Sequence, residues 1–487
     1  MNDLRAAYEQ TRYPAYVHPL THPSRLAAVA AILGHTPPDP ARARVLDIGC
    51  GSGTNLLAMA ASLPGGSFHG IDFSSPDIAS AQALAEESGL DNIRFETADL
   101  MSWEPSGTYD YVIAYGLFSW VPDEVKDRLL GLIAEVLAPG GLAAVSYAVY
   151  PGAKADEGLR DLLMAGDPKA GDSGERASAA VNVLSLLERA WGRSADTAMA
   201  TYMVQRASAM RSKTPEYLAL DDLGIVRDPC YLTQFTDWSW EHGLSYLGDA
   251  DLANCLLASL PDATAAEIAA MALGPIEQTQ LLDYITQTTF RTSLLLKGTS
   301  KAMTAYNPEA IANLSFRTKL KPVRSTASKS RFKDELGRDI TLTGAIRRIV
   351  DYLARHPHEF VALSQVVAAI ETETGSILGA AEHSKLRIDL LTMVATRLVE
   401  VSALPNRLND TVSVHPQLTP MNRLLARERA IVVSTCHEPI MLTAEQQQLA
   451  ELLDGSRTLQ MIERAFAKSP ISGDVARLVT ALTQFGC

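Results

Sequence analysis

Three glycines stand at alternate positions, Gly49, Gly51 and Gly53, directly after an apolar run at residues 45–48. Such a loop between a strand and a helix lets the backbone turn tightly and approach a ligand closely. The loop departs from the dinucleotide fingerprint Gly-x-Gly-x-x-Gly, because Thr54 stands where the third glycine would be. The carboxylate of Asp47 would also repel a pyrophosphate. The sequence therefore disfavours NAD.

Acidic residues follow the next two predicted strands as well. Asp72 comes 19 residues after Gly53 and can accept hydrogen bonds from both hydroxyls of a ribose, and Asp99 can accept one from an adenine amino group. S-adenosylmethionine fits this pattern, because it has ribose hydroxyls, a cationic tail and sulfonium, and no phosphate. The predicted cofactor-binding residues are Asp47, Gly49, Gly51, Gly53, Asn55, Asp72, Phe73, Asp99, Leu100 and Tyr115, with Tyr13 and His22 as a cap over the cofactor. The alternative for Tyr13 and His22 is an N-terminal arm that packs on the sheet.

Aromatic residues gather after two further predicted strands, at the edge where ligands of parallel sheets bind. Tyr115 follows one strand, and Tyr147 and Tyr150 stand at the end of the other. Aromatic faces can stabilise a sulfonium or hold an amine. We therefore predict catalytic roles for Tyr115, Tyr147 and Tyr150, against the alternative that these rings only pack beneath the next region. No general base stands out in the sequence.

Metal and thiol chemistry find little support. His18 and His22 are four residues apart, but Pro19 and Pro23 prevent the helix that would bring both to one ligand-facing side. The five cysteines are scattered and never spaced Cys-x-x-Cys, which argues against a disulfide framework and a structural zinc site. We expect no metal, reduced thiols, and a packing role for Cys50.

These residues must be positioned by alternating strands and helices, the pattern of a parallel sheet with crossover helices. We predict strands over residues 43–48, 68–73, 93–98, 111–115 and 142–148, and a helix over 55–63. The fold class is α/β, with a Rossmann-like domain over residues 1–153 that binds S-adenosylmethionine.

The rest of the chain reads differently. Residues 154–316 show helical periodicity, for example over 184–210 and 277–296, and predict a helical middle domain. A basic stretch predicts a linker over residues 317–339. Residues 340–487 predict a mixed α/β C-terminal domain, in which short β-like runs at 411–414 and 431–433 permit a winged-helix-like unit.

Length and composition set the wider limits. At roughly 150 residues per domain, 487 residues allow about three domains. Apolar residues make up 47% and no run reaches the roughly 20 that a membrane helix needs, so we expect no membrane insertion, and the N-terminus does not look like a secretory signal. The expected location is the cytoplasm. The net charge of -13, with a near-neutral C-terminal region outside the basic stretch, argues against nucleic acid as a partner; a homodimer is left open.

Several motifs extend the argument beyond the glycine loop. The chain carries Tyr-Gly-Leu-Phe-Ser-Trp-Val-Pro at residues 115–122 and Ser-Tyr-Ala-Val-Tyr-Pro-Gly at 146–152, with further motifs at 13–23, 228–232, 242–247, 290–291 and 452–457. With these motifs the chain resembles class I S-adenosylmethionine-dependent methyltransferases that carry a methyltransferase regulatory domain. The best-known members are bacterial protein-lysine methyltransferases acting on outer-membrane proteins. The resemblance covers essentially the whole chain and implies a methyltransferase with a polypeptide substrate.

Three positions depart from that family's pattern, and the run at residues 217–222 also lacks the His-Glu pair that the resemblance would lead us to expect there. Related sequences usually have His where this chain has Tyr115, and Asn and Trp where it has Ala148 and Ala153. The resemblance would place these positions at the methyl-transfer pocket. From the resemblance we expect N-methylation of a lysine in a protein or peptide. The departures suggest the alternative, which is methylation of a small molecule or a biosynthetic natural-product peptide. A second alternative is a cofactor-sensing regulator whose C-terminal domain binds nucleic acid. Residues after 340 are expected to serve architecture and substrate docking.

Overall fold

The computed structural model of the chain describes residues 13–165, 173–193, 197–298, 306–326, 328–406 and 413–485. Cys487 and residues 411 and 412 of a predicted β-like run lie outside these ranges. The centre of the molecule is a seven-stranded sheet with the strand order β3-β2-β1-β4-β5-β7-β6. Neighbouring strands among β1 to β5 pair in parallel, whereas β7 pairs antiparallel with both β5 and β6. The strands are β1 Arg44–Ile48, β2 Ser67–Asp72, β3 Ile93–Thr97, β4 Tyr109–Ala114, β5 Leu137–Ala148, β6 Leu244–Asp249 and β7 Phe290–Lys297.

Helices cover both faces of this sheet, which confirms the predicted Rossmann-like class. Successive strand residues point to opposite faces, so Val45 belongs to one hydrophobic core and Leu46 to another. The first core includes α2 (Pro23–Ile32), α3 (Thr54–Ser62) and α4 (Ser75–Ser88), and the second includes α5 (Asp123–Val136) and α10 (Leu232–Glu241). The predicted strands, and the helix predicted over residues 55–63, agree with the structure to within a few residues. The exception is β5, which begins five residues earlier than predicted.

The middle region differs from its prediction, because it supplies two strands to the central sheet. Its helices are α6 Ala153–Ala165, α7 Ser173–Arg193, α8 Ala198–Arg211, α9 Pro215–Tyr217, α10, α11 Asp262–Ala270 and α12 Pro275–Thr286. The helix expected over 277–296 ends at Thr286, and the chain then enters β7. Five consecutive residues of β7 are buried, so the strand shows no alternation of apolar and polar residues. Periodicity alone does not distinguish such a run from a buried helix.

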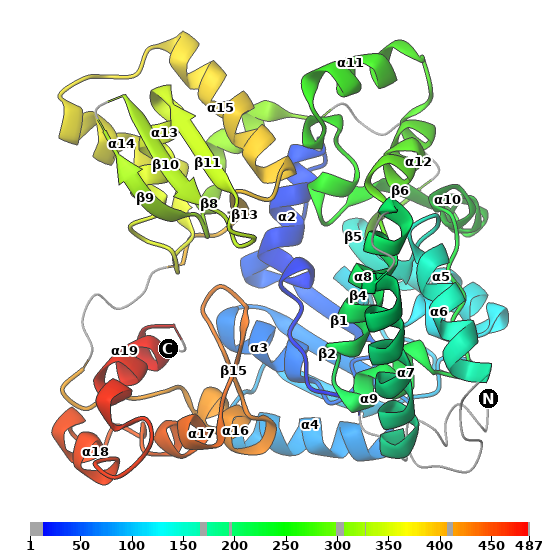
Figure 1. Cartoon of the computed structure of the whole chain (residues 1–487), viewed down its shortest axis with the longest axis horizontal. Coiled ribbons are helices and arrows are strands. Elements are labelled where there is room, and N and C mark those ends of the chain that lie inside the picture. Colours follow the sequence, from blue (N-terminus) through cyan, green and yellow to red (C-terminus); the bar gives the residue numbers. More distant parts are fainter. Residues whose placement is uncertain are drawn as a thin grey trace.

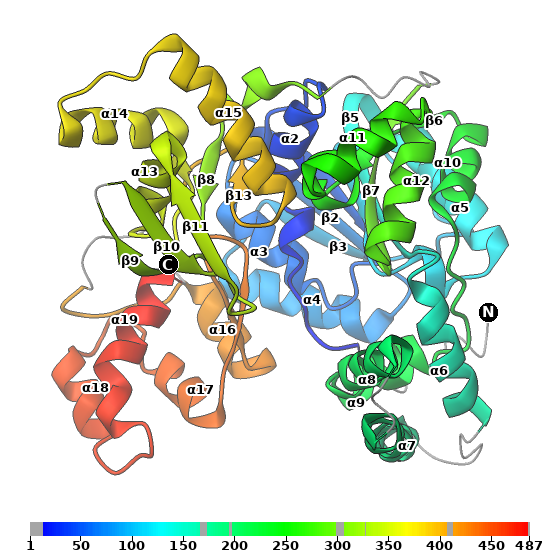
Figure 2. The same ribbon diagram turned by 45° about the horizontal axis from the view of Figure 1, so that its top comes forward.

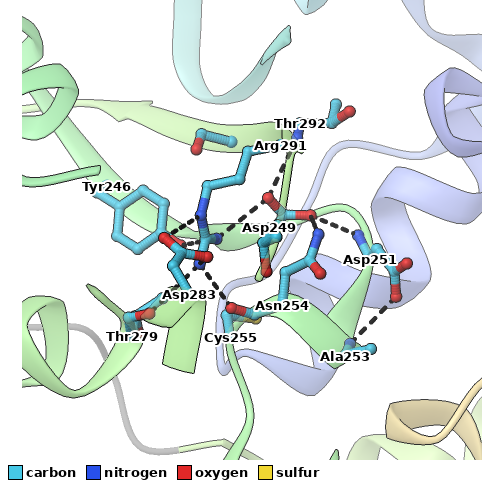
Figure 3. A network of polar contacts seen from close by, with 12 residues as sticks. Tyr246, Asp249, Asp251, Ala253, Asn254, Cys255, Thr279, Asp283, Arg291 and Thr292 are labelled. Atoms are coloured by element: carbon cyan, nitrogen blue, oxygen red, sulfur yellow. Dashed lines mark hydrogen bonds and ion pairs between the residues drawn. The ribbon is translucent and has the colours of Figure 1, made fainter. Parts of the chain in front are cut away.

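A buried ion network joins these two strands to α12 (Figure 3). Arg291 of β7 donates to both carboxylate oxygens of Asp283, at 3.1 and 2.8 Å, and to Asp249 of β6 at 3.3 Å. All three side chains are fully buried. A further hydrogen bond from Arg291 reaches the backbone oxygen of Asn254 at 2.8 Å. The network fixes β6 and β7 against α12, which lies between them in the sequence.

The predicted basic linker is also regular structure. Residues 317–339 contain the last residue of β8 (Ser315–Arg317), all of β9 (Lys321–Ser325) and β10 (Lys329–Lys333), and the first residue of β11 (Asp339–Thr343), and β10 pairs with both β9 and β11. In β10 the basic residues alternate with the buried side chains of Ser330 and Phe332. Basic composition therefore marks the exposed face of a strand here rather than an unstructured connection.

The C-terminal region continues as a mixed α/β structure. In Figure 1 it lies to the left of the central sheet, coloured yellow to red, and Figure 2 shows α15 beside α2. Leu353, Val366 and Leu390 of this region share one hydrophobic core with α2 and one face of the central sheet. Its elements are α13 Gly344–Leu353, β12 Val361–Ala362, α14 Leu363–Thr374, α15 Ala380–Ala395, β13 Glu400–Ser402, α16 Pro420–Arg429, β14 Ile431–Val433, β15 Pro439–Met441, α17 Ala444–Glu451, α18 Leu459–Ala465 and α19 Val475–Phe485.

The part of the chain that the structure describes holds neither a membrane-spanning helix nor a metal-ligand cluster. No helix in that part of the chain combines the length and the apolar character needed to span a bilayer. The same residues contain no group of three or more histidine, cysteine or acidic side chains arranged to hold a metal ion.

Candidate active site

A cavity of about 570 Å³ opens at the carboxyl ends of β1, β2 and β4. This is the edge of a parallel sheet where ligands bind. The N-terminal arm, the glycine loop and a turn of the middle region close around it. Its lining residues are Tyr13, Pro14, Tyr16, His18, Asp47, Gly49, Cys50, Gly51, Ser52, Thr54, Asn55, Asp72, Phe73, Ser74, Asp77, Tyr115, Gly116, Leu117, Trp120, Val121, Lys213, Tyr217, Asp221 and Phe290.

The glycine loop takes a backbone path that side chains would obstruct. Gly49, Gly51 and Gly53 all have positive φ angles, of 76, 52 and 74°, which residues with a Cβ seldom adopt. A Cβ at Gly53 would lie 2.6 Å from the Phe95 ring, whereas the position at Gly51 is open. Gly53 begins α3 and does not line the cavity. The loop thus brings Gly49 and Gly51 to the cavity while Gly53 packs the helix onto the sheet.

Two carboxylates stand beside this loop, the buried Asp47 and the half-buried Asp72. Asp72 accepts hydrogen bonds from the backbone N–H of Gly51 at 2.8 Å and of Ser74 at 2.9 Å, one on each oxygen. The backbone of Phe73 also hydrogen-bonds to this carboxylate, and its remaining lone-pair capacity can accept from a ligand hydroxyl. Asp47 is 4% exposed and makes no hydrogen bond or ion pair within the described part of the chain. Burial, aided by the charge of Asp72, raises the pKa of Asp47 to about 7.

This arrangement fits the predicted cofactor. A buried carboxylate without a partner is costly, and a cationic ligand in the cavity would supply one to Asp47. Asp72 lies beyond the glycine loop, where a ribose would meet its free lone pairs. S-adenosylmethionine, which carries cationic groups and ribose hydroxyls, matches both demands.

Eight of the predicted cofactor residues line the cavity: Tyr13, Asp47, Gly49, Gly51, Asn55, Asp72, Phe73 and Tyr115. The other four, Gly53, His22, Asp99 and Leu100, lie outside it. His22 caps α2, where its Nδ1 accepts from the Ser24 N–H at 3.2 Å, and it faces a second cavity of about 280 Å³. Asp99 accepts from the Met101 N–H at 3.0 Å in the turn after β3, with Leu100 beside it. The cap over the cavity is therefore made by Tyr13 without His22.

The structure does not bring Tyr147 or Tyr150 to the cavity, so neither is in position for the catalytic role predicted. Tyr147 is fully buried, stacks on Phe235 with ring centroids 4.2 Å apart, and lies 2.9 Å from the Ser293 hydroxyl. Its place in β5 directs the ring to the face covered by α10. Tyr150 lies beyond the strand and donates to Glu157.

The two alanines that depart from the family pattern are also away from the cavity. Ala148 and Ala153 are buried, and neither is among the lining residues. The backbone N–H of Ala148 donates to the Ser119 hydroxyl at 2.9 Å. The expectation that both positions border the methyl-transfer pocket is wrong, whereas Tyr115 does line the cavity.

Further lining residues were missed because they come from distant parts of the chain. Asp221 lies on a single π-helical turn, Leu218–Asp222, more than 100 residues after the glycine loop. Such turns occur frequently at functional sites. Tyr217 precedes the turn, and Tyr16 follows the arm residue Tyr13. Only the repeated tyrosines of the arm offered a signal in the sequence.

Aromatic rings and one carboxylate meet at this end of the cavity. The hydroxyl of Tyr13 donates to Asp221 at 3.2 Å, and the ring of Tyr217 lies 5.7 Å from that of Tyr13. Burial raises the pKa of Asp221 to about 6 and that of Tyr115 to about 12. The ring of Tyr115 stacks on His18 at 4.0 Å, and burial lowers the pKa of His18 to about 4. This end of the cavity therefore offers aromatic rings, the Asp221 carboxylate with a pKa of about 6, and the Lys213 ammonium, which lies 5.0 Å from the centroid of the Tyr217 ring.

Family comparison agrees with this geometry. Residues 45–141 match the family described as a methyltransferase domain, and residues 214–297 match a predicted methyltransferase regulatory domain. With the seven-stranded sheet and the glycine loop, these matches define a class I S-adenosylmethionine-dependent methyltransferase domain, and S-adenosylmethionine is its cofactor. The regulatory domain contains β6, β7 and the turn that carries Asp221.

Individual relatives cover different parts of the chain. The uncharacterized protein RP789 from Rickettsia prowazekii is 28% identical over 290 residues, which is 59% of this chain and 52% of that protein. Trans-aconitate 2-methyltransferase from Deinococcus radiodurans is 36% identical over 108 residues, 22% of this chain and 39% of that enzyme. The fold is that of PKMT2 from Rickettsia typhi, solved alone and in complex with AdoHcy. The structure of PKMT2 without AdoHcy matches this chain with a TM-score of 0.83 and 22% identity, and the match covers 96% of this chain and 97% of PKMT2.

Proposed function

We propose that the protein transfers a methyl group from S-adenosylmethionine to the side-chain nitrogen of a lysine in a polypeptide. The observation that carries this proposal is the aromatic and acidic end of the cavity, where Asp221 lies among tyrosines. The cofactor supplies an electrophilic methyl group on a sulfonium. What the chain must add is a site that holds an amine and takes its proton.

The rings suit an incoming ammonium group. Faces of Tyr and Trp attract cations within about 6 Å of the ring centroid, and the cavity is lined there by Tyr13, Tyr16, Trp120, Tyr217 and Phe290. An apolar surrounding also lowers the pKa of a lysine by desolvation, from a reference value near 10.4. The site therefore both attracts the protonated amine and eases the loss of its proton.

Asp221 is the group that can receive that proton. Its carboxylate faces the same cavity, and burial raises its pKa to about 6, closer to that of a desolvated amine than an exposed aspartate would be. The proton moves from the ammonium to Asp221. The nitrogen lone pair then forms the bond to the methyl carbon as the carbon–sulfur bond breaks and the sulfur keeps that electron pair. The products are a methylated ammonium and S-adenosylhomocysteine.

A polypeptide acceptor is favoured by the rest of the chain. The motifs that resemble bacterial protein-lysine methyltransferases run through all its regions. The shared fold with PKMT2 likewise extends over 96% of the chain, far beyond the methyltransferase domain. Large protein surfaces suit a macromolecular substrate. Of the three departures that suggested methylation of a small molecule, Ala148 and Ala153 do not border the cavity, and Tyr115 does.

Asp221→Asn tests the assignment. The parent enzyme should lose kcat as the pH falls through about 6, because the carboxylate must be ionised to accept a proton. The variant should turn over at least about tenfold more slowly and lack this pH limb. Asp237→Asn, at an exposed aspartate of α10, is the matched control and should behave as the parent. An unchanged pH profile in Asp221→Asn would exclude Asp221 as the proton acceptor.

A further inference from the structure

The turn between β14 and β15 reaches the first turn of α3, across most of the sequence. In Figure 1 this hairpin, in orange, lies beside the blue helix α3. His437 of the turn is 4% exposed, and its Nε2 lies 2.9 Å from Oδ1 of Asn55. Asn55 lines the cofactor cavity. A residue of the C-terminal region thus contacts a side chain of the cofactor site.

The hydrogen bonds of Asn55 define how His437 acts. Oδ1 of Asn55 also accepts from the backbone N–H of His18 at 2.9 Å, and Nδ2 donates to the Thr21 hydroxyl at 3.0 Å. Because an amide oxygen only accepts, Nε2 of His437 carries the hydrogen. The other ring nitrogen, Nδ1, has no hydrogen-bond partner among the described residues. The polar contact of the ring is therefore the one to Asn55.

The backbone at His437 is held in an uncommon conformation. Its φ angle is 58°, in the left-handed region that residues with a Cβ seldom adopt. The turn is closed by hydrogen bonds from His437 N–H to Ser434 and from Ser434 N–H to Glu438, each 2.9 Å. Strained residues of this kind persist where the surrounding structure requires them and are found at functional sites. In this backbone conformation the buried ring of His437 contacts Asn55 in the first turn of α3.

A second contact joins the same two regions. Arg429, in the last turn of α16, donates to the Ser80 hydroxyl of α4 at 2.8 Å and to the Thr54 hydroxyl at 3.4 Å. Thr54 lines the cofactor cavity next to Asn55. The C-terminal region therefore touches the glycine-loop helix at two adjacent residues.

We propose that His437 is a positioning residue for cofactor binding, which holds Asn55 and, through it, the N-terminal arm in the form that receives S-adenosylmethionine. The C-terminal region then does more than the architecture and docking expected from the sequence. Since binding couplings are reciprocal, the cofactor in turn stabilises the docked hairpin of residues 431–441.

Substitution of His437 tests this role. In His437→Ala the Kd and KM for S-adenosylmethionine should rise about tenfold, while kcat at saturating cofactor changes less than about twofold. His437→Gln, which keeps an N–H donor on a similar reach, should recover most of the affinity. His415→Ala, at an exposed histidine of the same region, is the control and should match the parent. Unchanged cofactor affinity in a folded His437→Ala, or failure of His437→Gln to recover it, would overturn the proposal.

A measurement on the unaltered full chain covers the case in which His437→Ala does not fold. Amide hydrogen exchange is followed with and without S-adenosylhomocysteine. Exchange over residues 431–441 should slow when this product binds, together with exchange in the glycine loop. Protection of the glycine loop with no change over 431–441 would show that the hairpin is not coupled to the cofactor site and would refute the assignment.

Discussion

Replacing Asp47 by asparagine should make the protein more stable and a weaker binder of its cofactor. The carboxylate is almost fully buried, has no partner in the described structure, and has a pKa raised to about 7 by burial. In the unfolded chain the same group titrates near 3.9. At pH 8 the Asp47 carboxylate is therefore charged in both states, and the charge costs more free energy in the folded protein than in the hydrated, unfolded chain.

The magnitude follows from that pKa difference. About three units correspond to roughly 4 kcal/mol as an upper bound, and the amide of Asp47→Asn also loses hydration on burial, so we expect a gain of about 1–3 kcal/mol at pH 8. Because the pKa of Asp47 is higher in the folded than in the unfolded protein, the contribution of this group to the free energy of unfolding is most favourable below pH 4. That contribution is lost as the pH rises from 4 towards 7. At pH 5 the folded carboxyl is mostly protonated, so the gain should be much smaller there.

Thermal unfolding of the cofactor-free proteins at pH 5 and pH 8 measures this effect, with Asp91→Asn at an exposed aspartate as the control. Calorimetric titration with S-adenosylmethionine measures the predicted loss of cofactor affinity. We expect binding to weaken by about 2 kcal/mol, because the charged contact is lost. A lower Tm than the parent at pH 8, or undiminished cofactor affinity, would refute the role of Asp47 as a carboxylate held ready for a cationic ligand.

Three further changes follow from the same structure. Asp72→Ala should weaken S-adenosylmethionine binding by roughly 2 kcal/mol in calorimetry, because a charge-assisted pair of hydrogen bonds is lost; equal affinity would remove Asp72 from the site. Tyr147→Phe should leave kcat within about twofold of the parent and cost about 1 kcal/mol of stability through the lost contact to Ser293; a large fall in kcat would restore its catalytic role. Arg291→Met should lower the free energy of unfolding by about 3–5 kcal/mol, since it strands two buried carboxylates; chemical denaturation that finds no loss would contradict the network's structural role.

The sequence predicted the cofactor half of the molecule well because its signals are local. A strand, three alternate glycines and a helix lie within about 20 residues, and Asp47 and Asp72 stand at or next to the ends of strands. Parallel strands share one edge for their carboxyl ends, so the acids could be brought together without knowledge of the rest. The match of residues 45–141 to a methyltransferase domain confirms the predicted domain.

The aromatic end of the cavity could not be derived in the same way. Tyr147 and Tyr115 both stand near strand ends, but only the three-dimensional register decides that Tyr147 points into the core under α10. Asp221 reaches the cavity from a π-helical turn, and His437 reaches Asn55 from 382 residues away. Contacts over such separations leave no periodic trace in the chain. The strands β6 and β7 were missed because their buried runs lack alternation.

The most direct test of the central claim is to locate the transferred methyl group. The full-length enzyme is incubated with methyl-labelled S-adenosylmethionine and lysine-containing polypeptides, and tandem mass spectrometry assigns the labelled atom. The account predicts label on lysine side-chain nitrogen, with none on matched polypeptides in which lysine is replaced by arginine. Label found only on oxygen or sulfur, or only on small molecules, would contradict it.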